Sequence, residues 1–302
     1  MIISASRRTD IPAYYADWFF NRLREGFVLS QNPMNPCQIR EIALSPEAVD
    51  CIVFWSKNPE PMLERLDALG AYPFYFQFTL NAYAQDIETR LPKKAVLIDT
   101  FRRLSEKIGA ERVIWRYDPI FLSDRYTLAY HIENFGKIAR LLGGCTEQVT
   151  ISFIDFYSKI EGNMKAHNIR QLRPEEQHAA ANEFARIAAE HHMKITACAE
   201  AADLSPYGVS HASCIDKQMI TRIIGRALAV KKDNNQRTNC GCAASVDIGV
   251  YNSCANGCLY CYANYSPVSV EKNRKKHNVC SPLLIGESPD KKITKESMRA
   301  TK

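Results

Sequence analysis

The chain begins with the segment MIISASRRTDIP (Met1–Pro12), in which a short apolar run is followed by charged and hydroxyl side chains. Met1–Ala5 is predicted to be a buried strand, with Ser6–Asp10 as a polar loop at its carboxyl end. The next stretch, Ala13–Glu25, places its apolar residues on one face and is predicted to be an amphipathic helix. A strand, a polar loop and a helix in this order form the repeating unit of parallel α/β proteins.

This unit recurs along the chain. Further strands are predicted at Cys51–Trp55, Phe74–Leu80, Arg112–Tyr117, Val149–Phe153 and Lys194–Cys198. The helices predicted between and after them are Pro61–Leu69, Lys94–Ile108, Tyr126–Leu142, Arg173–His191 and Cys214–Ala229. The pattern favours a (β/α) barrel of the TIM type, or a partial barrel, with about six to seven parallel strands. We expect residues 1–235 to form the barrel body, 236–266 a cysteine-rich cluster-binding segment, and 267–302 a basic, loosely ordered tail.

The composition, 46% hydrophobic and 24% charged residues among 302, is that of a globular α/β protein. Because no long apolar run or secretory leader is visible, we expect a cytoplasmic protein that does not bind membranes. Of the net charge of +6, residues 267–302 carry +5, which leaves +1 for the body. A basic face for nucleic acid is therefore not evident in the body, although the tail leaves nucleic-acid binding open.

Polar residues follow each predicted strand, at the edge where parallel barrels build their active sites. These groups are Ser6–Asp10, Ser56–Asn58, Asn81 with Tyr83, Arg116–Asp118, Ile154–Lys159 and Glu200. Among them, Lys57, Arg116, Asp118 and Tyr157 are the predicted catalytic residues, and Tyr157 or Tyr117 is a candidate hydrogen-atom relay. Together with Trp55 and Trp115 they are expected to surround the barrel mouth. Such a mixture of rings and charges suits a small polar molecule or a nucleotide-like substrate.

Eleven cysteines in a chain without a secretory leader point to metal binding and not to disulfides. Three of them, Cys254, Cys258 and Cys261, have the spacing C-x3-C-x2-C on one loop. Such a loop can wrap a cubane cluster so that each thiolate takes one iron. The fourth iron then has no protein thiolate from this motif, and an open site is where a cofactor or substrate binds.

This motif, with an aromatic residue before the last cysteine, resembles the signature of the radical SAM superfamily. The resemblance implies a 4Fe-4S cluster whose open iron is chelated by S-adenosylmethionine (SAM). It implies that the reduced cluster cleaves SAM, and that a 5′-deoxyadenosyl radical then abstracts hydrogen from the substrate. Tyr260 holds the aromatic position that typically lies near the adenine. An electron donor such as flavodoxin or ferredoxin is implied as a partner.

The whole chain up to about Tyr265 also resembles an uncharacterised bacterial and archaeal family of unknown function with a radical-SAM-like cysteine cluster near its C-terminus. The segments that carry this resemblance are SRRTDIP (Ser6–Pro12), FWSKNP (Phe54–Pro59), WRYDP (Trp115–Pro119) and the stretch Cys240–Asn264. This resemblance supports the cofactor and does not specify the substrate.

Radical SAM proteins usually carry the motif after their first strand, whereas here it follows six strand–helix units. A circular permutation accounts for this: Ser245–Val250 would correspond to the usual first strand and Met1–Ala5 to the usual second. The loop after the second strand usually holds the SAM amino group through a Gly-Gly-Glu-like segment, for which this chain has SRRTD. On this hypothesis Ser6, Thr9 and Asp10 hold the ammonium, and Arg7 or Arg8 meets the carboxylate.

Four further cysteines, Cys198, Cys214, Cys240 and Cys242, are enough for a second iron–sulfur cluster or a zinc site, or are buried free thiols. Two other functions stay open. One is an iron–sulfur electron carrier or sensor that does not cleave SAM. The other is a zinc-stabilised nucleic-acid-binding module, but of the cysteines in the motif only Cys258 and Cys261 have the spacing of a zinc knuckle.

Overall fold

The computed structural model describes residues 1–237, 239–287 and 293–295. Eight of the described strands form one sheet, in the order β10-β1-β4-β5-β6-β7-β8-β9, and every neighbouring pair is parallel. Their bounds, in that order, are Val246–Asp247, Ile2–Ala5, Cys51–Ser56, Phe74–Thr79, Val113–Ile120, Gln148–Phe153, Lys194–Cys198 and Ser210–Ala212. The predicted parallel α/β architecture is confirmed. Within the described part of the chain, β10 and β9 are the two edges, and no pairing between them closes a barrel.

Strand β10 lies beside β1, with Ile3 opposite Val246 and Ser4 opposite Asp247. The segment before the cysteine loop thus becomes the neighbour of the first strand of the chain, as the permutation hypothesis predicts. The carboxyl end of β10 leads toward Cys254, and that of β1 leads into Ser6–Asp10. Since carboxyl ends of neighbouring parallel strands meet at one edge of a sheet, these two loops lie together.

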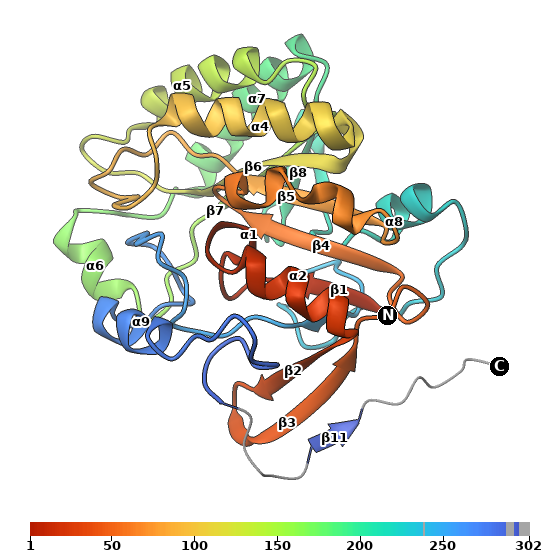
Figure 1. Cartoon of the computed structure of the whole chain (residues 1–302). Helices are drawn as coiled ribbons and strands as arrows, with labels where there is room; N and C mark the ends of the chain where they lie inside the picture. Colours follow the sequence, from red (N-terminus) through yellow and green to blue (C-terminus); the bar gives the residue numbers. More distant parts are fainter. Residues whose placement is uncertain (238, 288–292, 296–302) are drawn as a thin grey trace.

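The helices occupy the intervals between strands. They are α1 (Ile11–Tyr14), α2 (Ala16–Glu25), α3 (Glu60–Leu63), α4 (Lys94–Ile108), α5 (Leu128–Leu141), α6 (Glu161–Ala166), α7 (Pro174–Glu190), α8 (Lys217–Ile224) and α9 (Pro267–Arg274), with 3-10 turns η1 (Leu66–Leu69), η2 (Ala110–Arg112) and η3 (Ser205–Tyr207). Figure 1 shows α4, α5 and α7 layered over one side of the sheet. The predicted helix Cys214–Ala229 is shorter than expected, because Gly225 adopts a left-handed conformation (φ 69°) and ends α8.

The two faces of the sheet differ in character. Alternate residues such as Phe54, Phe76 and Trp115 join the large apolar core under the helices. Their neighbours point to the other face, where Gln77, Arg116, Thr150, Thr196 and other polar side chains are buried. The same face also carries a smaller apolar cluster that includes Val53, Tyr75 and Ile114. A buried charged side chain such as Arg116 is nevertheless unusual for a purely structural core and is typical of a site.

Strand alternation overturns two expectations about the barrel mouth. Trp115 is fully buried on the helix side, where it stacks on Phe135 and donates a hydrogen bond to Leu80. Tyr117 faces the same side, with its hydroxyl hydrogen-bonded to His131. Neither residue reaches the polar face, because successive side chains of a strand point in opposite directions.

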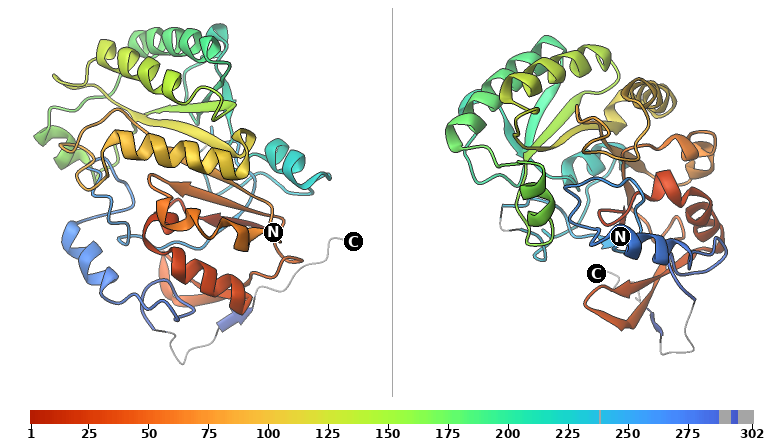
Figure 2. Two further views of the ribbon diagram at one scale, coloured as in Figure 1. Left: turned by 45° about the horizontal axis from the view of Figure 1, so that its top comes forward. Right: turned by 90° about the vertical axis from the view of Figure 1, so that its left-hand side faces the viewer.

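A second, small sheet consists of β2 (Phe27–Asn32) and β3 (Asn35–Ala43), which pair antiparallel, and β11 (Ile293–Lys295), which pairs with β3. It projects beyond the main sheet in the right-hand view of Figure 2. The described part of the tail packs onto the body: the indole of Trp18 donates to the carbonyl of Ser281, and Leu284 is buried in the main core. None of the helices in the described residues combines the length and the apolar character needed to cross a membrane.

Candidate functional site

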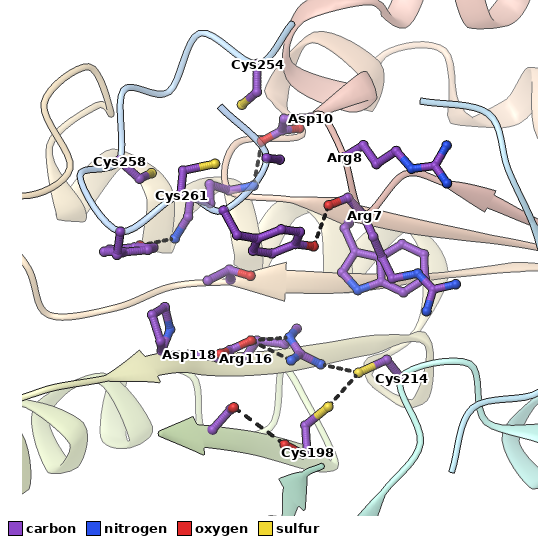
Figure 3. Close-up of a pocket in the computed structure, with 18 of the residues that line it drawn as sticks. Arg7, Arg8, Asp10, Arg116, Asp118, Cys198, Cys214, Cys254, Cys258 and Cys261 are labelled. Atoms are coloured by element: carbon purple, nitrogen blue, oxygen red, sulfur yellow. Dashed lines mark hydrogen bonds and ion pairs between the residues drawn. The ribbon is translucent and has the colours of Figure 1, made fainter. Parts of the chain in front are cut away.

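A single cavity of about 380 Å³ opens at the carboxyl edge of the main sheet (Figure 3). Trp115 and the alternative relay Tyr117 do not line it, whereas the residues predicted to be catalytic, cofactor-binding or metal-binding do: Ser6, Arg7, Arg8, Thr9, Asp10, Lys57, Arg116, Asp118, Tyr157, Cys198, Cys214, Cys240, Cys242, Cys254, Cys258, Tyr260 and Cys261. These residues come from segments as far apart as β1 and the loop after β10. The fold therefore brings the predicted site residues to one place.

The loop that carries Cys254, Cys258 and Cys261 closes one side of the cavity, and Figure 3 shows the three sulfur atoms gathered there. Its backbone is fixed on both sides of the motif, since Tyr15 donates to the carbonyl of Ser253 at 2.6 Å and Asn264 to that of Cys254 at 2.9 Å. Burial raises the pKa of all three thiols, that of Cys258 to about 12. Without a compensating cation these thiols stay protonated.

Asp247 fixes the loop that follows β1, and sequence reasoning missed it. Its carboxylate accepts hydrogen bonds from the hydroxyls of Ser4 and Ser6 and from the backbone of Arg7 and Gly249. Nothing in the local pattern SVDIG marks this aspartate. Its role follows only from the pairing of β10 with β1.

Asp10 joins three segments at the floor of the site. Its two oxygens accept hydrogen bonds from the hydroxyl of Ser56 (2.7 Å), the backbone of Lys57 (2.8 Å) and the amide of Asn256 (3.0 Å), and it also caps α1 through Ala13. Burial nevertheless raises the pKa of Asp10. The carboxylate is already fully used within the protein, as is the hydroxyl of Ser6.

Two oxygen atoms of cavity residues are buried without a hydrogen-bond partner among the described residues. They are Oγ1 of Thr9 and Oδ1 of Asn264. Buried polar atoms are almost always satisfied, so an unpaired one calls for a ligand or water. Thr9 therefore has acceptor capacity that Ser6 and Asp10 do not.

Arg7 and Arg8 extend away from the three thiols in Figure 3. The guanidinium of Arg7 lies over the ring of Trp55, and Asp247 and the cysteines Cys242 and Cys214 raise its pKa against the opposing effect of burial. The guanidinium of Arg8 lies over Tyr251. In this arrangement Arg7 lies on the side of the cavity that holds Cys214 and Cys242.

Lys57 is the cation beside the loop of Cys254, Cys258 and Cys261, which we call the three-cysteine loop. Its ammonium donates to Glu88 and to the hydroxyl of Tyr260, both at 2.8 Å. Burial opposes the charge on Lys57, but Glu88 outweighs it and raises the pKa of this lysine. Glu88 also pairs with Lys94, so the cluster of two lysines and one glutamate carries a net positive charge next to Cys258. Glu88 lies in the loop after β5 and was not predicted from the sequence.

Tyr157 occupies a different position from the other predicted catalytic residues. It lies in the loop after β7, is 41% exposed, and packs near the ring of Tyr262 on the cysteine loop. It borders the cavity at the surface, whereas Arg116 and Lys57 lie inside.

The buried Arg116 and the partly exposed Asp118 form an ion pair on β6. The guanidinium donates to the Asp118 carboxylate and, at 3.0 Å, to the sulfur of Cys214. Although burial opposes the charge, Cys214 and Asp118 raise the pKa of Arg116. The sulfur of Cys214 lies 3.1 Å from that of Cys198. Figure 3 shows this chain of contacts on the side of the cavity away from the three-cysteine loop.

Among the described residues, no three His, Cys, Asp or Glu side chains are already arranged around the position of one metal ion. The three-cysteine loop nevertheless fits a cubane cluster in its donor set: three thiols on one short loop, lining one cavity, beside a net positive charge. In a cubane each thiolate binds a different iron, so the sulfur atoms stand farther apart than around a single ion.

Comparison with known proteins identifies a family. The sequence model of a family described as "Domain of unknown function (DUF1848)" matches residues 2–263. None of the curated proteins matches this chain. A solved structure described as a candidate alpha-L-fucosidase from Bacteroides thetaiotaomicron overlaps 71% of this chain and 82% of its own, at 11% identity and a TM-score of 0.28. The TM-score and the sequence identity are too low for this likeness to bear on fold or function.

Proposed function

The chain belongs to the DUF1848 family, and we propose that it is a radical-SAM-like enzyme whose 4Fe-4S cluster is held by Cys254, Cys258 and Cys261. When bound, the reduced cluster supplies an electron that cleaves SAM into methionine and a 5′-deoxyadenosyl radical. The substrate that loses hydrogen is a small or nucleotide-like molecule in the same cavity. The family supports no choice among chemistries, so the proposal rests on the site.

One observation carries this proposal: the pairing of β10 with β1 places the C-x3-C-x2-C loop against the SRRTD loop over a cavity. Two contacts join the loops directly. Asn256, inside the motif, donates to Asp10 at 3.0 Å, and Tyr262, just after it, donates to the carbonyl of Arg7 at 2.7 Å. A cluster loop and a cofactor-binding loop need this proximity, because SAM must reach the open iron and the protein at once.

In this proposal different residues bind the ammonium and the carboxylate of SAM. The unpaired oxygens of Thr9 and Asn264 accept hydrogen bonds from the ammonium. Lys57, not Arg7 or Arg8, is the cation that faces the SAM carboxylate, because it lies beside Cys258 and Cys261. Asp10 and Asp247 do not touch SAM and hold the two loops in register.

Lys57 has a second proposed role, in stabilising the charge of the cluster. A cluster with three thiolates is anionic and becomes more so on reduction. The positive charge of Lys57 and Lys94, only partly balanced by Glu88, stabilises the anion inside a low-dielectric site. Tyr260, packed near Tyr83 and Phe121, presents its ring at the same wall and is the surface proposed for the adenine.

The test is an anaerobic assay. The full chain is purified without oxygen, reconstituted with iron and sulfide, reduced with dithionite and mixed with SAM, and 5′-deoxyadenosine is measured by mass spectrometry. We expect a brown protein that produces 5′-deoxyadenosine and methionine in equal amounts, and no product from Cys254→Ala. Cys51→Ala, which removes a buried thiol inside β4, is the matched control and keeps the activity.

Two outcomes would overturn the proposal. A brown protein whose cluster is reduced but yields no 5′-deoxyadenosine would favour an electron carrier or sensor. A colourless protein that contains zinc at the three-cysteine loop would favour a zinc-stabilised binding module.

A further inference from the structure

The second cysteine group, which we name the four-cysteine group, consists of Cys198, Cys214, Cys240 and Cys242. Its members come from three segments: the end of β8, the turn after β9, and the stretch between α8 and β10. The sulfur of Cys198 lies 3.1 Å from that of Cys214. All four thiols line one cavity, and the pKa of Cys242 is influenced by both Cys214 and Cys240. Four thiols from distant parts of a chain rarely converge by chance.

The main sheet and the loops fix the backbone of this group. Tyr75 and Gln77, on the polar face of β5, both donate to the carbonyl of Cys214, at 2.7 and 3.0 Å. The backbone of Asp233 donates to the carbonyl of Cys242 at 2.9 Å, and that of Ala243 to the carbonyl of Ile215 at 3.0 Å. The sulfur positions are thus set by hydrogen bonds that do not involve the sulfurs.

Two of the four sulfurs, those of Cys214 and Cys242, accept hydrogen bonds of the kind that support a thiolate. Arg116 donates to the sulfur of Cys214 at 3.0 Å, and the backbone of Ile215 donates to that of Cys242 at 3.4 Å. Arg7 adds a second cation that interacts with Cys214 and Cys242. Donors aimed at sulfur are the outer-shell contacts that metal-bound thiolates use. The buried Arg116 and the partly buried Arg7 offset part of the charge that four thiolates leave on a divalent ion, since each also pairs with a carboxylate, Asp118 or Asp247.

We propose that Cys198, Cys214, Cys240 and Cys242 bind one thiophilic divalent ion, zinc or iron, as a second metal centre separate from the three-cysteine loop. Four sulfurs is the donor set that selects such ions. Around one ion with bonds of about 2.3 Å, neighbouring sulfurs of a tetrahedron stand about 3.8 Å apart. Cys198 and Cys214, at 3.1 Å, are closer than this, and the four thiols are not yet arranged around one position, so the side chains must rotate to take up the ion.

The sulfur contacts favour a single ion over a second cubane. A cubane spreads its thiolates over four irons, which would require the 3.1 Å contact between Cys198 and Cys214 to open widely. Since all four thiols line the cavity, an ion can reach them. The proposed centre stands beside Arg116 and Asp118, and so forms the wall of the substrate cavity that faces the three-cysteine loop.

The first arm of the test isolates this group. In the full-length Cys254→Ala/Cys258→Ala/Cys261→Ala variant, Co²⁺ is added anaerobically and the sulfur-to-cobalt absorption bands are followed, with bound zinc and iron measured by elemental analysis. We expect about one ion per chain and the bands of a tetrahedral tetrathiolate site. Adding Cys214→Ala lowers the affinity by at least about 100-fold, whereas adding Cys51→Ala leaves it unchanged.

The second arm uses the unmodified chain, so that it does not depend on variants that fold poorly. The protein, stripped of metal and kept reduced, is alkylated with and without Zn²⁺, and each cysteine is followed by peptide mass mapping. We expect zinc to protect Cys198, Cys214, Cys240 and Cys242, while the exposed Cys37 and Cys280 react equally in both samples.

Three results would overturn the proposal: no protection of the four cysteines, cobalt binding that survives Cys214→Ala, or a disulfide between Cys198 and Cys214 in the anaerobically purified chain. The outcome is independent of SAM cleavage. A chain that binds the second ion but makes no 5′-deoxyadenosine would refute the proposed function alone.

Discussion

The three-cysteine loop and the four-cysteine group line the same cavity but are built in opposite ways. Cys254, Cys258 and Cys261 lie within eight residues of one loop, Cys254 is buried while Cys258 and Cys261 are partly buried, and Lys57 is the cation beside them. The four-cysteine group draws on three segments, two of its sulfurs are in contact, and Arg116 donates to one of these. The first design leaves room for a cluster with an open iron. The second is closed, since every ligand comes from the protein. We infer that the three-cysteine loop holds the reactive centre. The ion proposed for the four-cysteine group then has a structural role, or tunes the electronic properties of the reactive centre.

The largest effects are expected when single metal ligands are removed by substitution, one from each cysteine group. Cys258→Ala is expected to abolish SAM cleavage, because an iron then loses its thiolate, while the ion at the four-cysteine group stays at about one per chain. Cys214→Ala is expected to do the reverse for metal content, removing the second ion and leaving iron and sulfide at the first site. Elemental analysis together with the 5′-deoxyadenosine assay measures both. Loss of both metals in each variant would contradict the separation of the two sites.

The next effect concerns Gly249, where β10 meets the SRRTD loop. A methyl group there would lie only 1.9 Å from the hydroxyl oxygen of Ser6. Gly249→Ala is therefore expected to lower the free energy of unfolding by about 3 kcal/mol and to reduce SAM cleavage, because the two loops are forced apart. The matched control is Gly136→Ala in α5, where the nearest atom is 3.8 Å away and no loss is expected. Denaturant melts of both variants check this. Equal stability of the two would show that the loops are not in tight contact.

Substitutions of Arg116 test the four-cysteine group without removing one of its cysteines. Arg116→Met is expected to weaken the ion at the four-cysteine group 10- to 100-fold, the effect of about one outer-shell contact, and to leave the iron content of the three-cysteine loop unchanged. Arg116→Lys keeps the charge and should recover much of the affinity. Cobalt titration of each variant measures this. An unchanged affinity in Arg116→Met would show that the guanidinium does not support these thiolates.

The smallest expected effect is on the pH dependence of the free energy of unfolding, and it comes from His131 in the scaffold that both groups share. His131 is buried between Tyr117 and the carbonyl of Phe121, and burial lowers its pKa to about 4. An unfolded chain binds this proton at higher pH than the folded one, so stability is present above pH about 6.5 and is lost as the pH falls toward 4. Between pH 7 and 5.5 the loss from this residue is about 1 kcal/mol. Urea melts of the wild type and of His131→Gln check it. The variant should lack this part of the pH dependence, and identical slopes would contradict the assignment.

The sequence was sufficient for features that depend on local pattern. Apolar strand runs such as Phe74–Leu80 and amphipathic helices such as Lys94–Ile108 were predicted within a few residues, because their periodicity is strong. The small sheet of β2 and β3 was missed, since the segment Phe27–Ala43 mixes polar and apolar residues without clear alternation. The face that each strand residue takes was also not assigned, which is why Trp115 and Tyr117 were misplaced.

The site shows the same division. The C-x3-C-x2-C loop and the polar residues after the strands could be recognised from spacing alone. Asp247 and Glu88 could not, because each becomes important only through partners far away in the sequence: Asp247 through Ser4 and Ser6, and Glu88 through Lys57 and Tyr260. Arg7 and Arg8 were plausible partners for a carboxylate by charge. Their directions depend on Trp55 and Tyr251, which only the fold brings near.

We propose that the three-cysteine loop holds a cluster with one iron open to SAM. Electron paramagnetic resonance of the dithionite-reduced chain tests it most directly, recorded before and after addition of SAM that carries heavy nitrogen in its amino group. We expect SAM to change the cluster spectrum and a hyperfine coupling to the labelled nitrogen to appear in the wild type and in Cys214→Ala. A cluster spectrum that saturating SAM leaves unchanged would contradict it.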